Sequence, residues 1–312
     1  MEVKYVGNGD VVLISGGGKV YTDIAARFCR SERDLKDIIT SPYDKRIVEN
    51  ILNSNHLAAT EFDYFIFGIQ GYSRVTEAQL IRKRIASYLI SSGRIEKNNK
   101  RKFSVVIPKN IEDIKSHIEV ESVDDIMIVD NDNYIPIRNY YPAVSKNNKY
   151  IIIVNTLSIL KAIEYWYNNA INENIPEEEA RYLKPQATEF KAIVGMNARA
   201  LIDWFKIRCC QNAQTEIRDL AYKMLKLCKN VAPDLFKDAG ASCVSLGYCP
   251  ENKRQNSKCK NKTLTHDDVL EFIKKEKTTK SIEIQKPNED LVDLSNGNLI
   301  YNNKPFFYDK LK

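Results

Sequence analysis

QLIRKRIASYLISSGR, residues 79–94, combines three arginines, one lysine and three serines with apolar residues at helical spacing. Arginine side chains stay charged at neutral pH, and their planar forks suit phosphate oxygens. At its end, Ser92, Gly93 and Arg94 place a hydroxyl, a permissive backbone and a guanidinium in succession. The stretch therefore predicts a site for an anionic, nucleotide-like ligand, with its basic residues on a helix at about 74–85 and a loop after it.

The segments around this stretch predict both strands and helices. Residues 2–15 indicate one or two short strands that end in a turn at 16–18, and the aromatic run 62–69 indicates a longer strand. A further strand is expected at 187–195. Helical patterns occur at 20–29, 31–39, 43–54, 156–172, 177–183, 197–209, 213–230 and 266–276. These patterns favour an α+β fold.

Residues 103–155 are less regular than the rest of the chain. Short strand-like pieces at 104–107, 125–129 and 150–154 lie among Asn- and Asp-rich turns. We interpret this segment as an insertion into a main domain of residues 1–250. Residues 251–312 are then a C-terminal extension.

The composition predicts a soluble, mildly basic protein, with 43% hydrophobic residues and a formal net charge of +6. This charge suits an anionic small ligand or a nucleic acid. However, the basic residues of 79–94 are interleaved with apolar ones, which argues against a nucleic-acid surface. No apolar run reaches the roughly 18 residues that span a membrane, and the start lacks a signal-peptide pattern. We therefore expect a cytoplasmic location and no membrane partner.

A second polar cluster lies at 197–208, in NARALIDWFKIR. On a helix, Arg199 and Asp203 share a face, so an ordinary surface salt bridge explains part of this pattern. Asn197 and Arg208 are eleven residues apart, three helical turns, and lie along one stripe. Taken alone, Arg181 is explained as a cation at a helix C-terminus, before Pro185.

Three cysteines, Cys243, Cys249 and Cys259, lie close together near the end of the chain. Their spacing differs from the paired C-x-x-C of a zinc site, and a fourth ligand would have to come from Cys228 or His266. Free thiols or a redox-sensitive pair fit the spacing better, so we assign no metal.

Together these motifs resemble the flavin-dependent thymidylate synthases, whose signature is R-H-R-x-x-S-x-N-x-x-S-x-R. Here it stands as RKRIASYLISSGR, residues 82–94. Upstream, the resemblance includes a His, an acidic residue and a Phe-rich strand, which His56, Glu61 and 62–69 match. Downstream, N-A-R-x-L and A-Q-x-E-I-R are matched at 197–201 and 213–218, and the ending at 239–251 resembles one branch of the family.

The resemblance implies a fold with a mixed sheet flanked by long helices, in a homotetramer whose active sites are shared between subunits. It implies reductive methylation of dUMP to dTMP, with FAD as cofactor and methylenetetrahydrofolate and NADPH as co-substrates. The residues implied to bind dUMP are Gln79, Ser92, Gly93, Arg94, Arg181 and Arg208, with Ser92 and Arg208 also catalytic. Those implied to bind flavin or folate are His56, Glu61, Arg82, Lys83, Arg84, Asn197, Arg199 and Asp203.

The chain departs from the family pattern on the flavin side. Lys83 replaces the central His of the signature, Leu89 replaces its Asn, and the usually polar next residue is Ile90. Asp203 stands where His or Asn is common. Leucine and isoleucine side chains make no hydrogen bonds. Two alternatives therefore stay open: a related flavoenzyme acting on another pyrimidine nucleotide, and a non-catalytic nucleotide-binding paralogue.

Overall fold

The computed structural model describes residues 1–17, 21–91, 103–112, 114–120, 127–130, 133–136, 143–146, 149–257, 259, 263–279, 300–301 and 304–305. The chain divides into two compact units. The first unit contains Met1–Trp204 and Gln214–Lys237, and the second contains Phe205–Ala213 and Asp238–Lys312. No described helix combines the length and the apolar character needed to cross a membrane.

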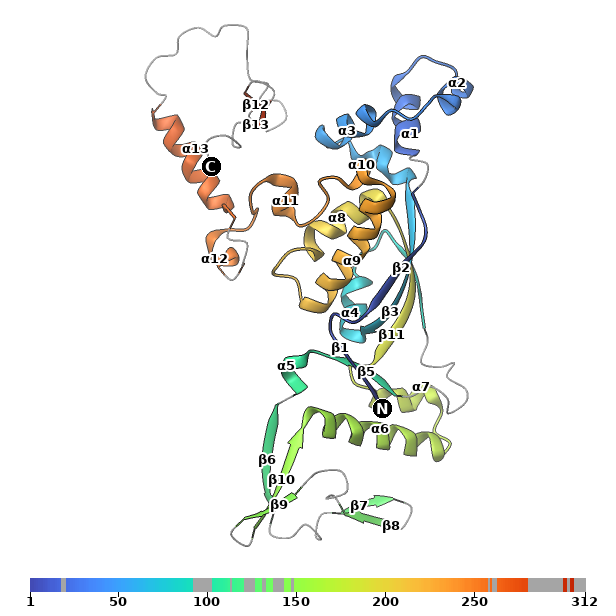
Figure 1. The fold of residues 1–312 in the computed structure, drawn as a ribbon, viewed down its shortest axis with the longest axis vertical. Coiled ribbons are helices and arrows are strands. Elements are labelled where there is room, and N and C mark those ends of the chain that lie inside the picture. The colour runs from blue at the N-terminus through green and yellow to red at the C-terminus, as the bar shows by residue number, and fades with distance from the viewer. Residues whose placement is uncertain are drawn as a thin grey trace. The chain divides into compact units, whose positions relative to one another are not determined.

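A four-stranded antiparallel sheet forms the centre of the first unit (Figure 1). Its order is β2 (Asp10–Ser15), β3 (Tyr64–Ser73), β11 (Glu189–Asn197) and β4 (Ser87–Ile90). The strands expected at 62–69 and 187–195 are confirmed as β3 and β11. They pair along their whole length, from Tyr64 opposite Asn197 to Ser73 opposite Glu189.

The two faces of this sheet differ in their surroundings. Alternate side chains of β3 and β11, among them Phe65, Phe67 and Val194, are buried. The helices on that side are α4 (Arg74–Leu80), α9 (Thr215–Val231) and α10 (Pro233–Phe236). The opposite face is apolar and exposed in the single chain. Its exposed large side chains are Val12, Ile14, Tyr64, Leu89 and Ile193.

The helix predicted over 74–85 is too long. The helix α4 ends at Leu80, and Arg82, Lys83 and Arg84 lie in the turn that follows it. Residues Ser87–Ile90 form the edge strand β4, paired with β11 from Gly195 to Ala192. Aromatic and branched side chains favour a strand once a partner is present, and that partner lies a hundred residues further along the chain.

Helices α1 (Tyr21–Arg30), α2 (Leu35–Thr40) and α3 (Lys45–Asn53) precede the 3-10 helix η1 (Leu57–Phe62). Buried Asp63 holds the start of α1, because its carboxylate accepts hydrogen bonds from the backbone N–H groups of Tyr21 (2.8 Å) and Thr22 (2.9 Å). This contact satisfies N–H groups that have no partner inside the helix. The three predicted helices are confirmed.

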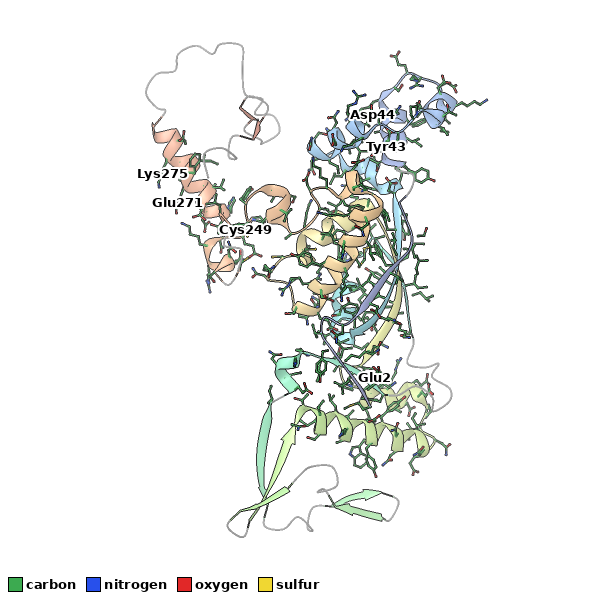
Figure 2. All side chains as sticks on the ribbon, viewed as in Figure 1. Glu2, Tyr43, Asp44, Cys249, Glu271 and Lys275 are labelled. Atoms are coloured by element: carbon green, nitrogen blue, oxygen red, sulfur yellow. The ribbon has the colours of Figure 1, made fainter. Side chains whose placement is uncertain are left out.

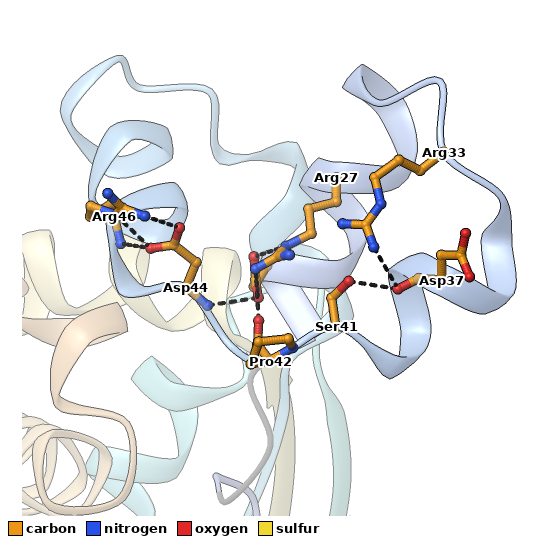
Figure 3. Close-up of polar contacts among 8 residues, drawn as sticks. Arg27, Arg33, Asp37, Ser41, Pro42, Asp44 and Arg46 are labelled. Carbon is orange, nitrogen blue, oxygen red and sulfur yellow. Dashed lines mark hydrogen bonds and ion pairs between the residues drawn. The ribbon is translucent and has the colours of Figure 1, made fainter.

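A second set of polar contacts joins α1 to the α2–α3 connection (Figure 3). The guanidinium of Arg27 pairs with buried Asp23 at 2.8 Å and donates to the carbonyl of Pro42 at 2.8 Å. Asp23 also accepts a bond from the backbone N–H of Asp44 at 3.1 Å. Because Asp23 is buried, these partners compensate its charge and fix the connection on α1.

The N-terminal strand β1 (Glu2–Tyr5) pairs in parallel with β5 (Ser104–Ile107), and α6 (Thr156–Asn172) packs beside them. Their shared core contains Phe103, Val105, Ile107 and Leu160. The predicted helix at 156–172 is confirmed. The one at 177–183 is confirmed as α7 (Glu177–Ala180) and the 3-10 helix η3 (Arg181–Leu183).

Between β5 and α6 lie short elements of the segment expected to be an insertion. A three-stranded sheet contains β6 (Lys115–Val120), β10 (Lys149–Asn155) and β9 (Ala143–Lys146), and α5 (Lys109–Glu112) precedes it. A hairpin contains β7 (Met127–Asp130) and β8 (Asn133–Pro136). The strand expected at 125–129 lies partly outside the described residues. The domain limits stay a prediction.

Glu189 joins three strands at the start of β11. Its carboxylate accepts hydrogen bonds from Lys4 of β1 (2.9 Å), Gly71 N of β3 (3.0 Å) and Ser104 of β5 (2.6 Å). Burial acts to raise the pKa of Glu189, but the bonds from Ser104 and Lys4 outweigh it and hold the pKa below its ordinary value. The same contact raises the pKa of Lys4.

Because the folded-state pKa of Glu189 lies below its unfolded value, its carboxylate stabilises the fold above about pH 4.5. This contribution is lost as the pH falls through the folded-state pKa. We expect Glu189→Gln to lower stability at pH 7 and to flatten its decline below pH 4.5. Urea unfolding of both proteins between pH 7 and acidic pH tests this. Parallel pH curves for the two proteins would contradict it.

The second unit contains α11 (Ser242–Leu246), α12 (Lys253–Asn256), α13 (His266–Thr279) and a short pairing of β12 (Ile300–Tyr301) with β13 (Lys304–Pro305). The helix expected at 266–276 is confirmed as α13. Figure 2 shows Glu271 and Lys275 on this helix, with Cys249 nearby in the chain. All seven cysteines are free. Among the described residues, no three His, Cys, Asp or Glu side chains are grouped to hold a metal ion.

Candidate functional site

Three successive cations, Arg82, Lys83 and Arg84, occupy the turn between α4 and β4. Both arginines are exposed and Lys83 is half-buried. No carboxylate in the described part of the chain forms an ion pair with any of them. The turn therefore concentrates positive charge that the chain itself does not neutralise, which suits an anionic ligand such as a diphosphate.

Tyr88, the second residue of β4, holds this turn. Its hydroxyl donates to the backbone carbonyls of Leu80, at 2.9 Å, and of Lys83, at 2.8 Å. Leu80 is the last residue of α4, so the first contact satisfies a carbonyl at the end of a helix. Burial raises the pKa of Tyr88 to about 12, so the hydroxyl stays protonated and remains a donor at neutral pH.

The start of β4 pairs with the end of β11, and Tyr64 at the start of β3 reaches across β11 to it. Ser87 is opposite Gly195, and the hydroxyl of Tyr64 bonds to that of Ser87 at 3.2 Å. A Cβ at position 195 would come within 2.6 Å of the Tyr64 hydroxyl. Glycine at this position therefore leaves space for the Tyr64 side chain.

At this end of the sheet, Asn197 ends β11 and directly precedes α8 (Ala198–Arg208). Its side-chain oxygen accepts a hydrogen bond from Ala200 N at 2.8 Å, as a helix cap does. Arg199 pairs with Glu61 of η1 at 2.5 Å. The structure thus brings Glu61, Asn197 and Arg199 together. The ion-pair partner of Arg199 is therefore Glu61, 138 residues away in sequence.

His56 and Asp203 complete the residues predicted for the flavin side. His56 is exposed and precedes η1, where its side chain makes no capping hydrogen bond. Asp203 is half-buried, one helical turn after Arg199 on α8. Arg208, at the end of the same helix, belongs to the second unit.

The opposite end of β4 leads toward the residues predicted to bind the nucleotide. Ser91 follows β4, and its backbone N–H donates to the carbonyl of Lys191 at 2.8 Å. Arg74, the first residue of α4, donates to the Ser91 carbonyl at 3.2 Å. Gln79, half-buried, lies on α4 itself. Ser92, Gly93 and Arg94 lie outside the described residues.

Arg181 is exposed in η3, seven residues before Thr188, whose carbonyl accepts a bond from Arg74 N at 3.0 Å. It therefore precedes the start of β11, whereas Asn197 ends this strand. Nine strand residues span about 30 Å. We call Glu61, Asn197 and Arg199 the flavin-side cluster. Within one chain, this cluster lies at the end of β11, whereas the segment of Arg181 precedes its start.

Two site-supporting residues, Tyr88 and Glu216, were missed by sequence reasoning. Tyr88 occupies an unassigned position of the signature. Glu216 received no role from the sequence, but its carboxylate is buried and accepts hydrogen bonds from Ser73 N (2.7 Å) and Ser73 Oγ (2.5 Å). No local pattern could have shown that Glu216 bonds to Ser73, because the two residues are 143 positions apart.

Comparison with known proteins adds independent information. A family model described as "Thymidylate synthase complementing protein" matches residues 16–234. Flavin-dependent thymidylate synthase from Geobacter sulfurreducens is 32% identical over 231 residues, which cover 73% of this chain and 84% of that protein. The protein of the same description from Clostridium tetani is 34% identical over 251 residues, with 80% and 89% covered.

A crystal structure of a UMP/dUMP methylase from Streptomyces cacaoi, bound with 5-Br dUMP, resembles this chain in fold. The TM-score is 0.53 at 15% sequence identity, and the match covers 76% of this chain and 96% of that chain. At this identity, the likeness supports a shared α+β fold alone.

Proposed function

Because this chain belongs to the family of flavin-dependent thymidylate synthases, we propose that it methylates dUMP to dTMP with FAD as its cofactor. We further propose methylenetetrahydrofolate as the one-carbon donor and NADPH as the reductant. The observation that carries the proposal is the cationic turn Arg82–Arg84, which has no ion-pair partner in the described chain and coincides with the family signature.

The residues present suit FAD. Two exposed guanidiniums on one turn match the charge of a diphosphate, and Arg199 and exposed His56 offer further donors at the same end of the sheet. When bound, the reduced flavin supplies a hydride, and the folate one-carbon unit becomes the 5-methyl group. Lys83 offers a cation in place of the usual imidazole, which suits an anionic part of the ligand.

On the nucleotide side, we propose that Gln79, Ser92, Gly93, Arg94, Arg181 and Arg208 bind dUMP. The arginines would neutralise the phosphate and stabilise negative charge that develops on the pyrimidine ring. Ser92 and Arg208 are the proposed catalytic residues. Asp203 would contact the flavin or folate. A cytoplasmic location suits the seven free cysteines, since thiols stay reduced in that compartment.

The experiment that tests this function is a turnover assay with a product measurement. Purified protein with FAD, NADPH and methylenetetrahydrofolate should bleach its flavin absorbance on reduction and should convert dUMP to dTMP, measured by mass. UMP and dCMP serve as comparison substrates. Methylation of one of these in place of dUMP would favour the related flavoenzyme, and dUMP binding without FAD binding would favour the non-catalytic paralogue.

We also propose that the active enzyme is a homotetramer with shared sites. Two features of the first unit support this. The flavin-side cluster and the segment of Arg181 are associated with opposite ends of β11, so a second chain can complete each site. The open sheet face carries exposed Val12, Ile14, Leu89 and Ile193, and such a contiguous apolar face is typical of an interface.

Leu89→Asp should disrupt this assembly, because it places a charge on the apolar face, where the Leu89 side chain is 71% exposed. We expect the solution mass, measured by light scattering, to fall from four chains to fewer, with loss of turnover. Leu246→Asp, on exposed α11, is the matched control and should keep the wild-type mass. A wild-type mass for Leu89→Asp would contradict the assignment of this face.

A further inference from the structure

The turn that carries Arg82, Lys83 and Arg84 has little packing of its own. Its apolar members, Ile81 and Ile85, are 46% and 68% exposed. The backbone bond that closes it, from Lys83 N to the Leu80 carbonyl, is long at 3.3 Å. A turn of this kind needs contacts from outside to keep one conformation.

Tyr88 supplies such contacts. It lies on the edge strand β4, which is paired with β11 and so belongs to the rigid sheet. The exposed residues of β4 are Ser87 and Leu89, whereas Tyr88 is half-buried and reaches the carbonyls of Leu80 and Lys83. These two carbonyls bracket Ile81, Arg82 and Lys83. A single hydroxyl proton shared between them therefore fixes the segment that contains Arg82.

We propose that Tyr88 is a positioning residue for the flavin, holding the cationic turn in the conformation that presents Arg82 to the anionic part of FAD. The proposal rests on the flavin-dependent function above. Tyr88 acts through its hydroxyl contacts to the turn and is not itself a catalytic residue. Without the hydroxyl, both carbonyls accept hydrogen bonds from water instead. The turn then samples other conformations, and FAD binding has to order it.

The test is Tyr88→Phe, which removes one oxygen and keeps the ring. Tyr43→Phe is the matched control, because Tyr43 also donates from its hydroxyl, to Asp234 at 3.1 Å, far from the turn in sequence. We expect trypsin to cleave the FAD-free Tyr88→Phe protein after Arg82, Lys83 and Arg84 about fivefold faster than the wild type. Initial rates with cleavage sites mapped by mass spectrometry measure this. Tyr43→Phe should match the wild type.

FAD affinity gives the second measurement. Titration by flavin fluorescence should show a Kd about fivefold higher for Tyr88→Phe, with a melting temperature within about 4 °C of the wild type. If Tyr88 acts through Arg82, the effect should shrink below about twofold in an Arg82→Met background. If the hydroxyl only stabilised the fold, its removal would lower the melting temperature. The loss of FAD affinity would then be the same with and without Arg82→Met.

The outcomes separate the two proposals. Wild-type cleavage rates in Tyr88→Phe, or an equal loss of FAD affinity with and without Arg82, would overturn the role of Tyr88. A wild-type protein that binds no FAD would overturn the flavin-dependent function. In that case the cleavage rates of the FAD-free protein still decide whether Tyr88 positions the turn.

Discussion

The double variant Arg82→Met/Arg84→Met should lose FAD affinity by more than about 100-fold and should purify without yellow colour. Both guanidiniums are exposed on one turn and lack an ion-pair partner in the described chain, so their charge is available to a ligand. A hydrogen bond between charged groups contributes about 1.5–3 kcal/mol. Two such bonds to a diphosphate account for a loss of about 10² to 10⁴.

The measurement is the FAD Kd from fluorescence titration, together with the flavin absorbance of the purified protein. Methionine keeps an unbranched, flexible side chain and removes the guanidinium with its charge and donors. Arg33→Met is the control, because Arg33 donates to a backbone carbonyl, that of Asp37 at 3.3 Å, in an exposed segment (Figure 3). FAD affinity within about threefold of the wild type for the double variant would contradict the assignment of this turn to the cofactor.

Glu216→Ala should destabilise the first unit by about 3 kcal/mol. The Glu216 side chain is only 2% exposed, and it accepts bonds from both the backbone and the hydroxyl of Ser73. Ser73 is the residue before α4, so α9 holds the start of the helix that carries Gln79. Alanine leaves two buried donors without a partner and also removes a negative charge from the first turn of α9.

Urea unfolding and thermal melting measure this effect, and we expect a fall in melting temperature of about 6–12 °C. Glu216→Gln keeps the shape and one acceptor oxygen, so its loss should be smaller. Glu49→Ala is the surface control, since Glu49 pairs with exposed Lys45 at 3.5 Å and should change stability by less than about 0.5 kcal/mol. Equal stability of Glu216→Ala and Glu49→Ala would contradict the structural role of Glu216.

Two departures from the family signature lie on opposite sides of β4. Leu89 is on the open sheet face, where its apolar side chain extends the surface proposed for self-association. Ile90 lies on the other side of β4, the same side as Tyr88. Positions 89 and 90 thus have no hydrogen-bonding side chain. On the same strand, the Tyr88 hydroxyl bonds to the cationic turn.

Long periodic elements were predictable from sequence. The helix α6 was expected at 156–172, and its observed limits are Thr156–Asn172. Apolar residues at helical spacing over five turns leave little ambiguity. The segment 87–90 was predicted wrongly because four residues are too few to show a period. Its strand conformation depends on pairing with β11, a contact that no local pattern encodes.

The sequence by itself determined the positions of the longer helices and strands, the motifs of the family and the type of ligand that its arginines suit. These properties follow from side-chain chemistry and from spacing within a few residues. Only the tertiary structure decided which residues meet: Arg199 with Glu61, 138 positions apart, and Glu216 with Ser73, 143 positions apart. Such contacts form when the packing of buried faces brings distant segments together, and packing depends on the whole chain.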